Sequence, residues 1–161
     1  MLMKDIYQIL DELGIAYKKH EHPPITTVEE GLEYRKDVEG LLIKNIFLRN
    51  KRGQRHYLVV IPHDKEVDLA KAREVVQDSK LGFAQEDRLM KYLGLKPGSV
   101  SLLGLINDEN QDVGVVIDNE VWKSEVICVH PNVNTATLEI SRDDLKKFLD
   151  HCGNAVHFAD L

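Results

Sequence analysis

The spacing of apolar residues alternates along the chain between the period of a helix and the period of a strand. Apolar residues recur at helical spacing over residues 6–13 and Gly14 follows them, which predicts an amphipathic helix that ends at this glycine. Capping residues and periodicity predict further helices, namely a short one opened by the capping box of Thr27 and Glu30, and others over residues 68–77, 86–93 and 141–149.

Runs of β-branched and aromatic residues, bounded by turn residues, lie between these helices. They predict strands over residues 16–19, 40–48, 57–61, 113–117, 126–129, 137–140 and 156–158. The turn at residues 50–53 joins the second and third strands, which we expect to pair as a hairpin. The mixture predicts an α+β fold, with a mostly antiparallel sheet flanked by helices, in a single domain spanning residues 1–161.

Lys44 stands in the middle of an otherwise apolar strand. Side chains alternate between the two faces of a strand, and apolar neighbours on both faces indicate that both are largely buried. An ammonium in such surroundings loses hydration worth several kcal/mol, unless it meets a partner, a wet pocket or a ligand. Lys44 is therefore the best single site candidate. The alternative is that it reaches solvent at a strand end or pairs with a carboxylate.

Composition indicates a soluble protein with a real core, since 43% of the 161 residues are hydrophobic and 30% are charged. The N-terminal residues lack the continuous apolar stretch of a signal peptide or membrane span, so we expect a cytosolic, cytoplasmic protein that does not bind membranes. Cys128 and Cys152 form no CxxC pair and are expected to remain reduced thiols.

The charge distribution separates a basic segment from an acidic body. A net charge of −6 argues against a surface that grips nucleic acid everywhere, because phosphate binding relies on concentrated Lys and Arg. Residues 44–56, however, carry only basic charged side chains: Lys44, Arg49, Lys51, Arg52 and Arg55. This segment would suit a phosphate-bearing partner, and a solvated hairpin turn is the alternative.

Two loops combine backbone freedom with polar side chains. In residues 96–104, Gly98 and Gly104 permit backbone shapes that could cradle an oxyanion, although a Pro-Gly pair is also common in ordinary turns. In residues 129–137, His130 ends a strand and is either catalytic or structural. The chain has no HExxH motif, cysteine-histidine cluster or glycine-rich nucleotide motif, so we expect neither a metal nor an organic cofactor.

Five segments in order resemble the YbaK/prolyl-tRNA-synthetase-associated domain family, and within it the free-standing prolyl-tRNA deacylases. They are residues 22–30, with His22-Pro23-Pro24, residues 44–49, with Lys44-Asn45, and residues 97–101, 104–108 and 130–137. The resemblance implies a mixed, partly closed sheet around a small pocket. It also implies hydrolysis, in trans, of the ester that joins a wrong amino acid to proline tRNA. Alanine is the first candidate for that amino acid and cysteine the second, because a proline-sized pocket cannot strongly exclude smaller residues.

The same resemblance implies the site residues. Lys44 would contact the substrate carbonyl or terminal ribose, Asn45 would fix orientation, N–H groups around Gly98 and Ser99 would hold the carbonyl oxygen, and His130 would line the pocket. Further substrate contacts are expected from His22, Thr27, Val100, Ser101, Leu102, Asn107, Asn134 and Thr135. Acceptor-stem phosphates would meet Arg49, Lys51, Arg52, Arg55 and Lys80.

Leu102 is a departure, since related sequences commonly carry proline there, and the larger side chain could change which amino acid fits. The expected partners are aminoacylated tRNA and prolyl-tRNA synthetase, and we expect a monomer or at most a weak homodimer. The rival hypothesis is a noncatalytic module that binds charged tRNA or a free amino acid.

Overall fold

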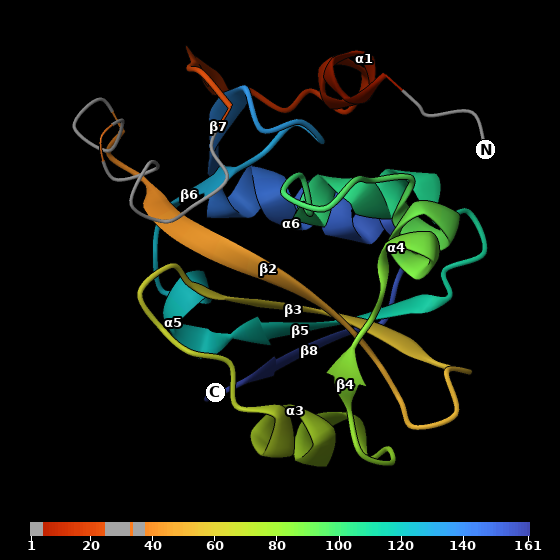
Figure 1. Ribbon diagram of the computed structural model, residues 1–161. Helices are drawn as coiled ribbons and strands as arrows, with labels where there is room; N and C mark the ends of the chain where they lie inside the picture. The colour runs from red at the N-terminus through yellow and green to blue at the C-terminus, as the bar shows by residue number, and fades with distance from the viewer. Residues whose placement is uncertain (1–4, 25–32, 34–37) are drawn as a thin grey trace.

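A computed structural model of the chain describes residues 5–24, 33 and 38–161, and it centres on a mixed eight-stranded sheet (Figure 1). The strands are β1 (Lys18–Glu21), β2 (Leu41–Arg49), β3 (His56–Pro62), β4 (Gly82–Phe83), β5 (Val113–Asp118), β6 (Val126–Val129), β7 (Ala136–Ser141) and β8 (Val156–Ala159). The order across the sheet is β1-β7-β6-β2-β3-β5-β8, and β4 pairs with β2 outside this path.

Strand pairing confirms the predicted mixed sheet. The antiparallel pairs β1–β7, β6–β7, β2–β3 and β2–β4 outnumber the parallel pairs β2–β6, β3–β5 and β5–β8. No pairing of described strands joins β1 to β8, so the sheet is open rather than partly closed. β2 joins the two halves of the sheet. It pairs with β6 only at Leu41 and Leu42, and with β3 from Ile43 to Arg49.

The helices cover both faces of the sheet. They are α1 (Ile6–Glu12), α3 (Leu69–Val76), α4 (Glu86–Leu93), the 3-10 helix η2 (Leu102–Asn107), α5 (Asn119–Trp122) and α6 (Arg142–Cys152). Figure 1 shows α3 on one side of β3, β5 and β8, and α4 and α6 on the other. The larger core cluster contains Leu93 and Phe148, from α4 and α6, whereas the smaller contains Ala72 from α3. No helix of the described residues is long and apolar enough to span a membrane.

The predicted elements agree with the structure wherever a cap or a long periodic run defined them. Asp68 caps α3 by accepting the N–H groups of Ala70 and Lys71, and Gly94 ends α4 in the left-handed conformation. The strand expected at residues 16–19 lies two residues later, at β1. The pattern missed β4, η2 and α5, which are too short for a periodic signal. The helix expected from Thr27 lies outside the described residues.

Candidate active site

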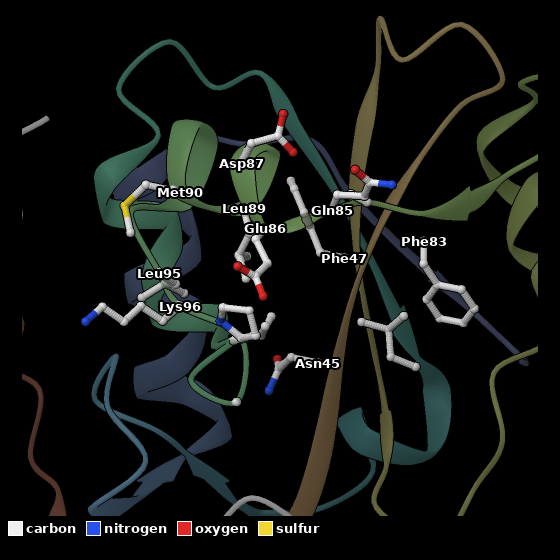
Figure 2. A pocket seen from close by; sticks show the side chains of 15 residues that line it. Asn45, Phe47, Phe83, Gln85, Glu86, Asp87, Leu89, Met90, Leu95 and Lys96 are labelled. Atoms are coloured by element: carbon white, nitrogen blue, oxygen red, sulfur yellow. The ribbon is translucent and has the colours of Figure 1, made fainter.

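A groove follows the part of β2 that no other described strand covers on one edge. The strand β6 ends its pairing at Leu42 and β4 begins its pairing at Leu48, so β2 is free on this side between the two. The groove has a volume of about 1490 Å³, and Asn45, Phe47, Gly98 and Val100 are among its lining residues. Figure 2 shows Asn45 and Phe47 beside β2. The predicted Lys-Asn segment (residues 44–49) and the loop of residues 96–104, which we call the glycine loop, therefore both contribute residues to this groove.

Lys44 and His130 occupy the same face of the sheet, on opposite sides of the gap between β2 and β6. The last paired residues of these parallel strands are Leu42 and Cys128, and each site residue follows two positions later. Lys44 is half-buried and stands beside Ile61 of β3. The ion pairs formed among the described residues do not include Lys44. This ammonium is therefore partly desolvated at the edge of the gap.

Asn45 points to the other face of β2 because neighbouring side chains in a strand alternate. Its Oδ1 atom is buried, and no donor among the described residues satisfies it. The residue lines the groove together with Pro97 and Gly98. The side chains of Lys44 and Asn45 therefore point to opposite faces of β2.

His130 is a neutral imidazole fixed by the backbone around it. Burial lowers its pKa, a hydrogen bond with Ala136 opposes that effect, and the nearby His22 adds to the lowering. The Nδ1 atom lies 3.3 Å from the carbonyl oxygen of Ala136, which can only accept, so Nδ1 carries the proton and Nε2 is an acceptor. Ser101 Oγ donates to the His130 carbonyl at 2.5 Å and ties the glycine loop to this residue.

His22 is fixed beside His130 by two neighbouring segments. Its backbone N–H donates to the Thr135 carbonyl at 3.0 Å, and its Nδ1 donates to the Pro23 carbonyl at 2.9 Å. Its Nε2 forms a hydrogen bond with Thr137 Oγ1, 2.9 Å away. Thr137 was not among the predicted contacts, although it lies on the face of β7 opposite the core residue Leu138.

The glycine loop needs glycine at one position. Gly98 has φ of +83°, and a Cβ atom there would lie 4.0 Å from Asn134 Nδ2, so the loop approaches the segment that follows His130. The N–H of Ser99 donates to the Lys96 carbonyl at 3.0 Å. In this conformation that N–H closes the turn, whereas the sequence predicts that it points at the ester.

Three predicted substrate contacts have internal partners instead. Ser101 is fully buried and caps η2 by accepting the Leu103 N–H. Leu102 is 1% exposed and belongs to the larger core cluster. Asn107 is buried and donates to the Leu93 carbonyl at 2.9 Å. These three residues hold the loop in position. Val100 is an apolar residue of the loop that lines the groove.

The predicted phosphate-binding residues come together at the turn between β2 and β3. The exposed side chains are Lys51, Arg52, Arg55 and Lys80, and Arg49 is partly buried with Nη1 donating to the carbonyls of Asn50 and Lys51. We call these five residues the basic turn. Ser79 Oγ accepts the Lys51 N–H at 3.1 Å, which holds the Lys80 segment against the hairpin.

Two partly buried groups of polar contacts hold the segments around the site and were not visible in the sequence. Arg88 Nη1 donates to the Gly53 carbonyl at 2.8 Å and to His56 Nε2 at 3.0 Å. Burial and the charge of Arg88 lower the pKa of His56 to about 4, so it is a neutral acceptor. Glu139 accepts from His20 at 2.8 Å and from the backbone N–H groups of Glu39 and Gly40. No local pattern could have paired residues so far apart in sequence.

Comparisons with known proteins identify the class of protein to which this fold and site belong. The model of the aminoacyl-tRNA editing domain matches residues 22–148. The Prolyl-tRNA editing protein ProX of Acetoanaerobium sticklandii is 43% identical over 154 residues, covering 94% of this chain and 93% of that protein. The Prolyl-tRNA synthetase associated domain-containing protein 1 of Danio rerio is 32% identical over 152 residues, covering 92% and 82%.

Solved structures with a similar fold include a protein of related description. The crystal structure of a proposed trans-editing enzyme for prolyl tRNA synthetase has a TM-score of 0.71 at 20% identity, covering 100% of this chain and 98% of that one. At that identity the likeness concerns the fold alone. The sequence match defines a hydrolase that edits aminoacyl-tRNA. The chain belongs to the aminoacyl-tRNA editing domain family.

Proposed function

We propose that this protein is a trans-acting deacylase that removes a wrong amino acid from proline tRNA. The observation that carries the proposal is the similarity, along almost the whole chain, to a relative named as a prolyl-tRNA editing protein. Alanine is the first substrate candidate and cysteine the second, because both are smaller than proline and a tight second site can accept them by size. Such an enzyme would act in the cytoplasm, alone or beside prolyl-tRNA synthetase.

The reaction is attack of water on the carbonyl carbon of the aminoacyl ester. The bond to the ribose oxygen breaks, that oxygen leaves with a proton, and the free amino acid retains the hydroxyl of the water. Lys44 places a positive charge beside the developing oxyanion or the terminal ribose. Because the residue is half-buried, this charge stabilises the oxyanion more strongly than a fully solvated charge would. A hydroxyl of the terminal adenosine positions the water, so no protein nucleophile is required.

The remaining site residues orient the substrate. Neutral His130 lines the amino-acid pocket, and its Nε2 is available as an acceptor because Nδ1 is engaged by Ala136. Asn45 presents an unsatisfied Oδ1 at the groove, and Gly98 lets the loop approach without a side chain. The proposed amino-acid pocket is completed by four residues around this centre, which are His22, Val100, Asn134 and Thr135.

The basic turn is the proposed contact for the acceptor-stem phosphates. It begins at Arg49, five residues along β2 from Lys44, a separation of about 17 Å at ~3.3 Å per residue. A charged tRNA is long enough to reach both places, whereas a free amino acid is not. Contacts of this kind position the substrate without reading its sequence, and they weaken as salt rises.

The test is a panel of proline tRNA charged with alanine, cysteine or proline, with ester loss compared to the spontaneous rate. We expect the alanyl ester to disappear fastest and the prolyl ester to persist. In Lys44→Met, turnover should fall by about 10²- to 10³-fold, as for removal of one oxyanion donor, while Lys123→Met, an exposed control, should match the wild type.

The two parts of the proposal fail separately. If no ester disappears faster at any enzyme concentration, the deacylase function is wrong. If a folded Lys44→Met protein turns over normally, only the role of Lys44 is wrong.

A further inference from the structure

Phe83 is an exposed aromatic side chain that the proposed reaction does not use. At 61% it is the most exposed of the large apolar side chains in the described part of the chain. It lines the same groove as Asn45 and Gly98. Exposure of a single apolar residue is ordinary on protein surfaces, so the exposure of Phe83 alone does not indicate a binding site.

The position of Phe83 lies between the two ends of the proposed tRNA site. Phe83 pairs directly with Leu48 across the antiparallel β2–β4 ladder, and opposite residues in such a pair point to the same face. Leu48 shares its face with Lys44, so Phe83 does too, about 13 Å further along at ~3.3 Å per residue. Figure 2 accordingly shows Phe83 and Asn45 on opposite sides of β2.

The basic turn begins immediately beyond Phe83. Leu48 is followed by Arg49 on β2, and Lys80 precedes Phe83 by three residues on the neighbouring segment. The backbone on either side of the ring is held in place, because Leu81 is buried and the Ala84 N–H donates to the Phe47 carbonyl at 3.0 Å. An exposed aromatic ring on an anchored backbone therefore stands between the proposed phosphate-binding surface and the proposed hydrolytic site.

We propose that Phe83 is a stacking platform for an unpaired base at the 3′ end of the charged tRNA, an inference that rests on the proposed function. Single-stranded nucleic acid is commonly held by aromatic rings on which bases stack, beside cations that track the backbone. Glu86 and Asp87 line the groove on the Asn45 side of β2 (Figure 2), where their carboxylates disfavour phosphate, so the nucleotides follow the side of β2 that carries Phe83.

The ring directs the last nucleotides along β2 toward Lys44. Stacking needs only the face of a base, so this contact selects an unpaired strand and not a particular sequence. Phe83 is then a positioning residue: it binds the nucleotides upstream of the ester and does not touch the reacting atoms.

The first experiment compares two substrates of different length. For alanyl proline tRNA, Phe83→Ala should raise KM by about 5- to 100-fold with little change in kcat. For 3′-alanyl adenosine, which lacks the upstream nucleotides, Phe83→Ala should behave as the wild type. Phe83→Trp should restore the tRNA KM, whereas Phe83→Leu should not. Phe158→Ala is the matched control, because Phe158 is 46% exposed on β8 and packs on Trp122.

The second experiment needs no turnover. An RNA hairpin with a fluorescent 2-aminopurine in its unpaired 3′ tail should be quenched on binding to the wild type and to Phe158→Ala, but not to Phe83→Ala. The stacking proposal is overturned if Phe83→Ala binds and quenches normally, if Phe83→Leu retains full affinity, or if both substrates lose activity equally. A wild type that quenches the probe but hydrolyses no ester would overturn the deacylase function alone.

Discussion

Glu139→Ala should destabilise the protein by about 3–5 kcal/mol, because one buried carboxylate joins three segments. Glu139 is 8% exposed and accepts hydrogen bonds at 2.8 Å from His20 Nε2, at 2.6 Å from the Glu39 N–H and at 2.8 Å from the Gly40 N–H. These donors belong to β1 and to the residues just before β2. A hydrogen bond to a charged group is worth about 1.5–3 kcal/mol, and three that share one carboxylate are not additive.

The same carboxylate should make stability depend on acid. Burial raises the pKa of Glu139, but the hydrogen bonds from His20, Gly40 and Glu39 outweigh it and the pKa is lowered overall. A carboxyl group whose pKa is lower in the folded state stabilises the protein above its unfolded pKa, about 4.3, and loses that contribution as pH falls through the folded pKa. The unfolding free energy of Glu139→Gln should therefore fall less over this range than that of the wild type.

Urea and thermal unfolding monitored by circular dichroism measure both effects. A loss of 3–5 kcal/mol corresponds to a fall in Tm of about 6–20 °C for a domain of this size. Glu74→Ala, at an exposed position of α3, should stay within about 0.5 kcal/mol of the wild type. A loss below about 1 kcal/mol in Glu139→Ala would refute the reasoning, since the carboxylate would then not hold the start of the strand that carries Lys44.

Two further predictions concern the basic turn and the glycine loop. The pKa of His56 is lowered to about 4, so wild-type unfolding free energy should fall as pH drops from about 6.5 to 4, and His56→Gln, which keeps an acceptor for Arg88, should remove this slope. An unchanged slope in urea titrations at several pH values would contradict the assignment. Gly98→Ala should cost about 1–2 kcal/mol through its φ of +83° and lower turnover, whereas Gly82→Ala, without a positive φ, should cost less. Equal losses in both variants would show that the backbone conformation of Gly98 is not the cause.

Much of the fold could be predicted because its signals are local. The caps at Asp68 and Gly94 act on their own helix ends, and the alternating residues of β2 and β3 flank one short turn. The parallel neighbours of β2 and β3, which are β6 and β5, could not be predicted, since the partners of a parallel strand are decided by packing across distant segments.

The candidate site likewise contains residues that the sequence indicates and residues whose placement it does not indicate. Lys44 could be proposed as a site residue from the sequence alone, because an ammonium in an apolar strand has few ways to avoid a desolvation cost. The burial of Ser101, Leu102 and Asn107 could not be predicted, because a loop residue gives no sequence signal that separates a side chain facing a ligand from one facing the core. Burial depends on which elements fold over a loop.

The sequence by itself determined the family, the capped helices, the central hairpin and the charge of the basic turn, all of which are encoded by residues near one another in the chain. Only the tertiary structure decided that Lys44 and Asn45 serve opposite faces of β2, and that Phe83 lies between Lys44 and the basic turn. The physical reason is that a sheet brings together residues from distant segments, through a register that no local pattern specifies.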